Sequence, residues 1–385
     1  MKQNSYISRK ELLFFAAWIV FLIALILDRT MWAANSEGFT KLLQLVRYGA
    51  YGICFVEILL DCFEQKRILV IGVLIVVTVL SYFGSKNKTM VLYLLLFLAA
   101  HEISARLVLA ITTIIQAVLL FGTVFCSQIG IAEDHIFEFT GRIRHGLGFS
   151  WTTTAAVLYF YMSFAYVCVR NKKITYIELA VMEVINFYFF KTTDSKMVFY
   201  LGTLGLVFWA LMKLLGFRFP ITKAFRHVVL FAPTVVAAFS VAIHKFYVAG
   251  NPFWDMANKF LNTRLRLGNE GIKNYGIHLF GNQIEWVGYT AGKENSDGYN
   301  YVDCSYLQIL LEYGLVFFAV VILIYTILLY KAIKSENYIM VWCILFILVF
   351  GITEPRLMNL SFNPFPVLLL CNYDWSKWHG KAEIT

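Results

Sequence analysis

Apolar runs recur from one end of this chain to the other, and they constrain its fold more than any other feature. A transmembrane helix needs about 20 apolar residues, and about twelve runs approach that length, although 90–100 and 362–371 are too short for a straight crossing. The runs lie at residues 11–27, 43–60, 68–83, 90–100, 107–126, 151–169, 174–190, 197–215, 228–244, 306–330, 338–352 and 362–371. The pattern predicts an all-α polytopic integral membrane protein with about 12 transmembrane helices in a single transmembrane domain, residues 1–385.

The composition excludes an ordinary soluble enzyme. Of the 385 residues, 59% are hydrophobic and 15% are charged, whereas soluble domains carry about 25% charged residues. The net charge of +9 is spread over short loops between the apolar runs, so we assign it to lipid headgroups and topology and expect no nucleic acid as a partner. The seven cysteines follow neither a disulfide framework nor a metal-ligand spacing.

The distribution of Lys and Arg predicts the orientation, because short cytoplasmic loops of membrane proteins are enriched in these residues. With a cytoplasmic N-terminus, Lys66, Arg67, Arg106, the segment 170–173 and Lys331 all fall on the cytoplasmic side. This bias favours both termini in the cytoplasm. Three polar segments then lie outside, and we expect any chemistry in them: a first outer loop at 127–150, a long extracytoplasmic loop at 245–305 and a last outer loop at 353–361.

The long loop 245–305 carries a predicted helix of its own. Asn251 followed by Pro252 is typical of a helix N-terminus. We predict an interfacial helix over residues 252–265, which would lie flat on the outer leaflet. Its apolar face would carry Phe253, Met256, Phe260 and Leu261. We expect the glycines from Gly268 onward to break the rest of the loop into turns.

Two Arg-x-Arg pairs are the first candidate site residues. Arg142 and Arg144, followed by His145, enter the span at 151–169, and Arg264 and Arg266 lie on the long loop. Each pair could simply anchor to lipid headgroup phosphates. Two pairs that face one outer vestibule favour a phosphate-bearing ligand, because guanidinium binds phosphate oxygens bidentately and keeps its charge at low dielectric. Opposed arginines can stabilise a pyrophosphate leaving group without a metal.

Two further clusters bring carboxylates to the outer segments. Asp303 precedes Tyr306 at the start of the run 306–330, where it could cap the helix or bind and activate a sugar hydroxyl. Glu354 and Arg356 lie two residues apart in the last outer loop and could pair with each other or line a site. No Asp-x-Asp cluster or other metal-ligand pattern accompanies them, so we predict neither a metal nor a cofactor.

Three stretches resemble the Wzy-type repeat-unit polymerases of capsule, exopolysaccharide and O-antigen synthesis, within the O-antigen polymerase and ligase superfamily. Residues 142–149 resemble the family's Arg-x-x-Leu-Gly-Phe entry into a span. Residues 263–281 look like its Arg-containing long loop that ends in Phe-Gly, and 301–314 are similar to its Val-Asp-x-x-Tyr opening of the next helix. The chain departs from the family where Trp151 to Thr153 replace His-Pro-Asn and where Ser195-Lys196 replaces Ser-Arg.

The resemblance implies a GT-C-like, metal-independent glycosyltransferase of the bacterial cytoplasmic membrane that polymerises undecaprenyl-pyrophosphate-linked oligosaccharides. A flippase and a chain-length regulator would be its partners. We hypothesise that one set of residues binds the donor pyrophosphate and sugar and that another set carries out catalysis. The binding set is Arg142, Arg144, Arg264, Arg266, Tyr306 and Arg356, and the catalytic set is His145, Asp303 and Glu354.

Two alternatives remain at this point. An oligosaccharide ligase of the same superfamily would share the outer arginines and the donor but use a different acceptor. A polysaccharide or lipid-linked oligosaccharide transporter would also have about twelve spans, but such folds commonly contain internal repeats, and the charges here concentrate outside the spans.

Overall fold

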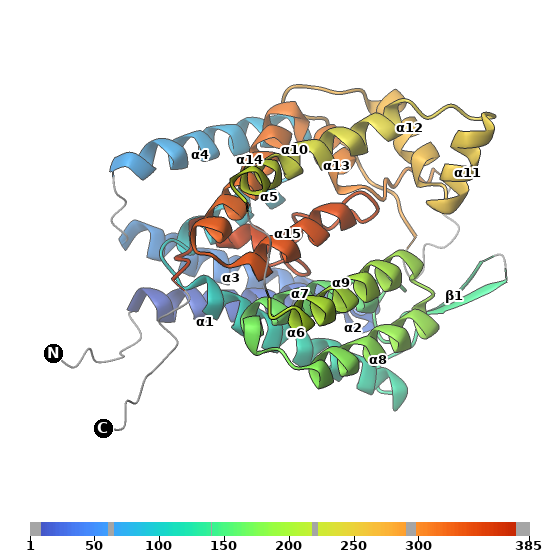
Figure 1. The fold of residues 1–385 in the computed structure, drawn as a ribbon, viewed down its shortest axis with the longest axis horizontal. Coiled ribbons are helices and arrows are strands. Elements are labelled where there is room, and N and C mark those ends of the chain that lie inside the picture. Colours follow the sequence, from blue (N-terminus) through green and yellow to red (C-terminus); the bar gives the residue numbers. More distant parts are fainter. Residues whose placement is uncertain (1–8, 61–64, 140, 218–221, 290–297, 375–385) are drawn as a thin grey trace.

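The computed structural model describes residues 9–60, 65–139, 141–217, 222–289 and 298–374, and most of these are helical (Figure 1). In chain order the elements are α1 (Arg9–Leu27), α2 (Met31–Ala34), α3 (Glu37–Leu60), α4 (Gln65–Ser85), α5 (Thr89–Ala99), α6 (Ala105–Gln128), β1 (Ile136–Phe139), β2 (Arg142–His145), α7 (Thr154–Arg170), η1 (Asn171–Lys173), α8 (Tyr176–Thr193), α9 (Lys196–Leu214), α10 (Lys223–Lys245), α11 (Pro252–Phe260), α12 (Arg264–Tyr275), α13 (Ser305–Gln308), η2 (Ile309–Tyr313), α14 (Gly314–Lys334), α15 (Tyr338–Phe350) and η3 (Phe365–Leu370).

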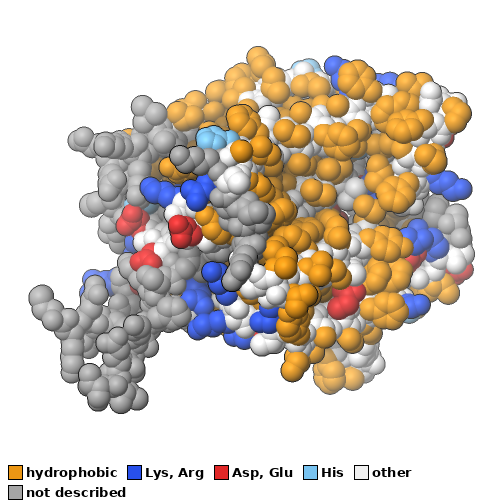
Figure 2. Space-filling model, in the orientation of Figure 1, with side chains coloured by type: hydrophobic (Ala, Val, Ile, Leu, Met, Phe, Trp, Pro, Cys, Tyr) orange, Lys and Arg blue, Asp and Glu red, His pale blue; other side chains and the backbone are white. Residues whose placement is uncertain are grey.

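Six of the described helical segments are long and apolar enough to cross a bilayer. They come from α1, α3, α6, α9, α10 and the continuous stretch 305–334, and shorter apolar helices lie in α4, α5 and α15. In Figure 2 hydrophobic side chains cover much of the visible face, while Lys, Arg, Asp and Glu gather mainly toward its two sides. Such a surface suits lipid in the middle and water at the ends. The prediction of a mostly helical, polytopic membrane protein is therefore confirmed, and the number of crossings remains a prediction.

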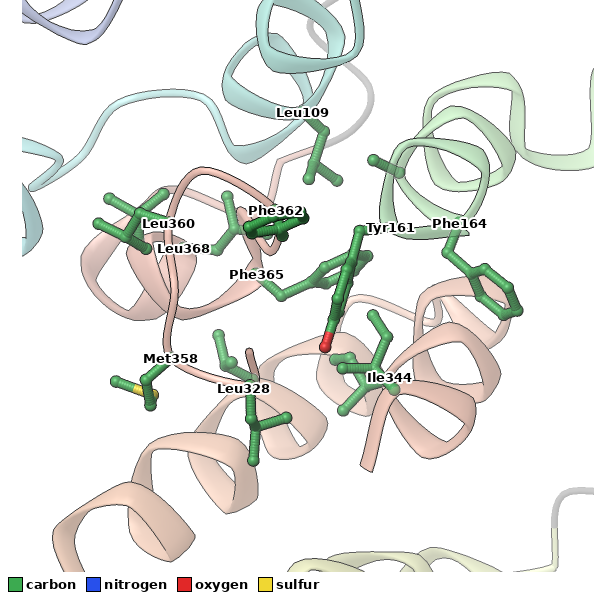
Figure 3. Close-up of a cluster of buried hydrophobic side chains, with 14 of the residues drawn as sticks. Leu109, Tyr161, Phe164, Leu328, Ile344, Met358, Leu360, Phe362, Phe365 and Leu368 are labelled. Carbon is green, nitrogen blue, oxygen red and sulfur yellow. The ribbon is translucent and has the colours of Figure 1, made fainter. Parts of the chain in front are cut away.

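The last apolar run, 362–371, is not an ordinary transmembrane helix. It contains only the six-residue 3-10 helix η3, and its side chains pack among α6, α7, α14 and α15 (Figure 3). Gln116 on α6 donates to the carbonyls of Ser361 and Phe362 at 3.0 and 2.9 Å, and Asn363 donates to the Leu357 carbonyl at 2.6 Å. Because protein groups satisfy these carbonyls, irregular backbone is stable in the apolar interior. The run is therefore no straight crossing, as its length predicted.

The β1–β2 hairpin, α11 and α12 lie at one end of the helix bundle, at the right of Figure 1. We call this end the loop end. The hairpin pairs Ile136 with His145 and Phe139 with Arg142 in antiparallel register. It was not predicted, and it makes the described chain mostly rather than entirely helical.

The helix predicted over 252–265 is shorter than expected and is followed by a second helix. Asn251 caps α11 as predicted, because its side-chain oxygen accepts from the backbone of Phe253 at 3.1 Å. The helix ends at Phe260, and Asn262 and Thr263 adopt positive φ before α12 begins. The exposed faces of Phe253 and Phe260 suit an interfacial helix.

The expected turns at Gly268 and Gly271 are wrong, because both glycines lie inside α12. A Cβ on Gly268 would lie 2.2 Å from the His244 ring, and one on Gly271 would lie 3.0 Å from Val302. The glycines therefore allow α12 to pack closely on α10 and on the chain before α13. Asn269 strengthens this packing by donating to the His244 carbonyl at 2.9 Å.

Three glycines allow three backbone segments to cross at the loop end. A Cβ on Gly281 would lie 2.1 Å from the Glu312 carbonyl oxygen, one on Gly314 would lie 2.2 Å from the Gly281 nitrogen, and one on Gly84 would lie 2.2 Å from the Phe280 carbonyl. The run 306–330, predicted as one continuous helix, contains the π-helical turn η2 just before Gly314. The crossing holds the segment around Gly281 in the long loop against this π-helical turn.

Candidate functional site

The hairpin presents its two arginines to the C-terminal end of α8. Alternate residues of a strand point to the same face, so Arg142 and Arg144 share one side of β2. Arg142 pairs with the Asp194 carboxylate, and Arg144 Nε donates to the Thr193 carbonyl oxygen at 2.8 Å. Asp194 ends α8 in the left-handed conformation, with φ of 48°, which Asp tolerates better than most residues.

Arg144 is half-buried among charges of both signs. Burial, followed by repulsion from Arg142, lowers the pKa of Arg144 to about 10, with a further contribution from Arg264. Asp194 and Asp303 act in the opposite direction. The guanidinium thus interacts with charges from α8, α12 and the chain before α13, which places the two predicted arginine clusters in one electrostatic field.

Arg264 pairs with Asp303 across two separate parts of the long loop. Arg264 Nε lies 3.5 Å from Asp303 Oδ2, and the two side chains are 18% and 30% exposed. The same Nε is buried and makes no hydrogen bond within the described chain. Asp303 does not cap a helix, because the N-cap of α13 is Cys304 and has no side-chain cap. The capping interpretation of Asp303 is therefore wrong.

Glu354 and Arg356 form the third part of the cluster. Arg356 Nη1 lies 2.8 Å from Glu354 Oε1, and the Arg356 guanidinium lies 4.6 Å from the centre of the Phe362 ring. Ser305 holds this segment in place, since its hydroxyl donates to the Glu354 carbonyl and accepts from the Leu357 backbone. The sequence left open whether Glu354 and Arg356 pair with each other, and they do.

Burial and three charged neighbours determine the pKa of Glu354. Burial raises the pKa of this carboxyl to about 7, and the nearby Asp303 charge acts in the same direction. Arg356 and Arg264 oppose the rise. A carboxyl with a pKa near neutrality can exchange a proton under ordinary conditions, as general acid–base chemistry requires.

Glu354→Gln should flatten the pH dependence of stability. The folded-state pKa is raised from 4.5 to about 7, so the stabilising contribution of the protonated group is fully present below pH 4.5 and is lost as the pH rises through 7. The shift corresponds to at most about 3 kcal/mol. Thermal unfolding of the detergent-solubilised wild type and Glu354→Gln between pH 4.5 and 8 measures the difference. Parallel curves for the two proteins would contradict the assignment.

A stack of aromatic rings borders the charged cluster. The rings of Trp151 and Tyr289 stack with centres 6.3 Å apart, and those of Tyr289 and Tyr299 stack at 4.5 Å. The Arg144 guanidinium lies 6.0 Å from the centre of the Trp151 ring, and the charges of Asp303 and Arg264 act on Tyr299. Aromatic rings beside charged groups suit the apolar faces and hydroxyls of sugars.

Tyr289 and Asp194 were not predicted as site residues. Tyr289 lies in no charged or motif-bearing cluster, and Asp194 lies between Lys191 and Lys196, where it reads as the polar end of two neighbouring spans. Trp151 lies where the chain departs from the family pattern, at the start of the stretch that replaces His-Pro-Asn. Its ring lies between the Arg144 guanidinium and the Tyr289 ring.

Three predicted residues lie apart from the cluster. His145 faces away from Arg144 on β2, and its Nδ1 lies 2.6 Å from the Asp134 carboxylate. Arg266 is half exposed and pairs with Glu270 one helical turn away at 3.0 Å. The Tyr306 side chain is buried, and its hydroxyl donates to the Leu348 carbonyl at 2.7 Å. These contacts assign Tyr306 to helix packing and give His145 and Arg266 local partners.

We define the site cluster by the residues that the structure brings together: Arg142, Arg144, Arg264, Asp303, Glu354 and Arg356. Within the described ranges, no three His, Cys, Asp or Glu side chains are grouped so that they could hold a metal ion. Comparison of the chain with protein-family models, with curated proteins and with solved structures finds no match.

Proposed function

We propose that this chain is a polysaccharide polymerase that joins undecaprenyl-pyrophosphate-linked oligosaccharide repeat units at the outer face of the bacterial cytoplasmic membrane. One observation supports this proposal most strongly. Three arginines from three segments of the chain, Arg144, Arg264 and Arg356, act on Asp303 or Glu354, and among them Arg264 has a buried Nε without a hydrogen bond in the described chain. A buried, unsatisfied guanidinium nitrogen is costly in the free protein and suits an anionic ligand.

The proposed reaction is a glycosyl transfer without a nucleotide sugar. A hydroxyl of the acceptor glycan attacks the anomeric carbon of the donor's first sugar, and the bond from that carbon to the pyrophosphate oxygen breaks. The lipid pyrophosphate leaves with the bonding electrons, and Arg264, Arg356 and Arg144 stabilise its charge. The hydroxyl proton passes to Asp303, which at 30% exposure is the more accessible carboxylate of the cluster.

Glu354 and the aromatic stack have supporting roles in this proposal. Glu354 is 7% exposed, so it orients Arg356 rather than contacting the acceptor directly. Trp151, Tyr289 and Tyr299 offer flat apolar surfaces on which the sugar rings of the repeat unit pack. The exposed apolar face of α11 would rest on the outer leaflet beside the lipid portion of the substrate.

The finer topology belongs to the same proposal. About twelve crossings in a GT-C-like arrangement, with both termini in the cytoplasm, would put the site cluster outside the cell membrane. A flippase would supply the lipid-linked repeat units there, and a chain-length regulator would act on the growing polymer.

Deletion of the gene in the source bacterium tests the proposal against its two alternatives. A polymerase defect leaves single repeat units on the lipid carrier at the outer leaflet. Loss of a ligase would leave full-length chains on the carrier, and loss of a flippase would leave single units on the inner leaflet. Extraction and sizing of the lipid-linked glycans, with leaflet assignment by an impermeant labelling reagent, separate the three results. Normal polymer in the deletion strain would contradict all of them.

A further inference from the structure

A polar cavity lies next to the site cluster and is formed by other elements. Its volume is about 330 Å³, near the lower end of the range for ligand pockets, which is about 300–1,000 Å³. Residues from the end of α1, from α3, from the start of α5 and from η2 line it. None of its lining residues belongs to the six-residue site cluster.

Three cationic side chains line this cavity. Arg29 is exposed, and its side chain has no hydrogen-bond or ion-pair partner within the described chain. Arg47 pairs with Asp28 at 3.1 Å, and Lys88 donates to the Tyr48 hydroxyl. One carboxylate, Glu312, also lines the cavity. The oxygens of Glu312 accept from Asn87 at 2.6 Å and Trp286 at 2.8 Å, so both are satisfied within the fold.

The remaining walls suit a sugar attached to an anion. Tyrosine rings and side-chain amides line the cavity together with the cations, among them Tyr51, Tyr93 and Asn359. Amides bind sugar hydroxyls as donors and as acceptors, while tyrosine rings pack on the apolar faces of sugar rings. The cations bind phosphate oxygens. The combination fits a sugar phosphate better than it fits a bare inorganic anion.

An apolar stripe on α3 leads from this cavity along the membrane-facing surface. Tyr48, Gly52, Phe55 and Leu59 are spaced at helical periodicity, and all four are exposed. Nothing lies within 4 Å of a Cβ placed on Gly52, so no neighbouring residue covers the stripe at this point. A hydrocarbon chain that follows the stripe would reach the cavity with its polar end.

Only a thin segment of chain separates the cavity from the site cluster. Pro355 lines the cavity, whereas its neighbours Glu354 and Arg356 belong to the cluster. Gln308 also lines the cavity and contacts Tyr301, on which the charges of Arg356 and Asp303 act. A ligand in the cavity would therefore end close to the residues of the proposed reaction.

We infer that the cavity lined by Arg29, Arg47 and Lys88 binds the sugar-phosphate end of a second lipid-linked glycan, with the lipid chain on the α3 stripe. This inference rests on the proposed function, because a polymerase must hold a donor and an acceptor that both carry a lipid phosphate. The site cluster binds one of them, and this cavity binds the other.

Binding stoichiometry tests the inference independently of catalysis. The purified full-length protein is titrated with undecaprenyl pyrophosphate, and bound lipid is counted by native mass spectrometry. The wild type should bind two molecules per chain. The double variant Arg29→Ala, Lys88→Ala should bind one and lose at least tenfold in affinity for the other, and Arg264→Ala should lose the complementary molecule. The matched control Lys41→Ala, Lys86→Ala removes two exposed lysines that do not line the cavity and should still bind two.

Parallel measurements separate the possible outcomes. Inorganic pyrophosphate and phosphatidylglycerol serve as competitors, and occupancy of the cavity by either one as strongly as by undecaprenyl pyrophosphate overturns the assignment to the lipid carrier of a glycan. Two bound lipids in the Arg29→Ala, Lys88→Ala variant, together with normal chain elongation, overturn the second site and leave the polymerase proposal intact. A wild type that binds the lipid at neither site and elongates no glycan overturns both.

Discussion

Arg264→Ala should reduce chain elongation by about a hundredfold to a thousandfold, the usual effect of removing one group that stabilises transition-state charge. Arg264 interacts with three other residues of the site cluster. It pairs with Asp303 at 3.5 Å, and its charge acts on Arg144 and Glu354. Its Nε is buried without a hydrogen bond in the described chain. Arg264→Lys keeps the charge but not the planar fork, so we expect it to restore only part of the activity. Polymer length in cells, resolved by gel electrophoresis, measures the effect.

Arg266→Ala is the matched control. Arg266 lies two residues away on the same helix, but it is half exposed and pairs with Glu270 one turn on. Exposed helical ion pairs of this kind contribute about 0.3–0.5 kcal/mol. Its removal should leave polymer length and protein yield close to the wild type. Equal loss in both variants would favour general attraction of anions by this helix over a specific role for Arg264.

Gly281→Ala and Gly314→Ala should each prevent stable folding, with a loss of more than about 4 kcal/mol. Both glycines have positive φ, of 91° and 87°, which costs an alanine about 1–2 kcal/mol. An added Cβ would also lie only 2.1 or 2.2 Å from backbone atoms of the segment it crosses. Backbone cannot move aside as a flexible side chain can. Yield and thermal unfolding of the detergent-solubilised protein measure the loss.

Gly122→Ala provides the corresponding control for the glycine variants. Gly122 lies within α6, and nothing lies within 4 Å of a Cβ placed there. Alanine is a better helix former than glycine by about 1 kcal/mol, so the substitution should be neutral or slightly stabilising. A stable, monodisperse Gly281→Ala protein would show that the segments at the crossing can separate without loss of the fold.

Local sequence patterns predicted the helical elements well, because hydropathy and helix signals depend on neighbouring residues. Each apolar run contains a helix in the structure, including the short run 362–371 with its surrounding protein. The cap at Asn251 was predicted for the same reason. The misinterpreted glycines of α12 have a tertiary cause. Gly268 and Gly271 are required by close packing against His244 and Val302, and a single sequence does not distinguish this from a turn.

The sequence identified the charged residues of the site cluster but not their partners. Charged side chains in otherwise apolar surroundings identified Arg264, Asp303, Glu354 and Arg356. Their pairing depends on how the long loop folds back on the end of α15, which no local pattern encodes. The same limit explains why His145 and Arg266 were grouped with their neighbours in sequence. Strand alternation and helix geometry direct both side chains to local partners instead.

The proposed polymerase activity is tested most directly by reconstitution. The purified protein is incorporated into liposomes that contain undecaprenyl-pyrophosphate-linked repeat units from the source bacterium, without nucleotide sugars, flippase or regulator. We expect lipid-linked glycans whose lengths are whole multiples of the repeat unit, with one undecaprenyl pyrophosphate released for each unit added, and little product from Arg264→Ala. Unchanged single units in the presence of folded wild-type protein, with each lipid still carrying its own glycan, would contradict it.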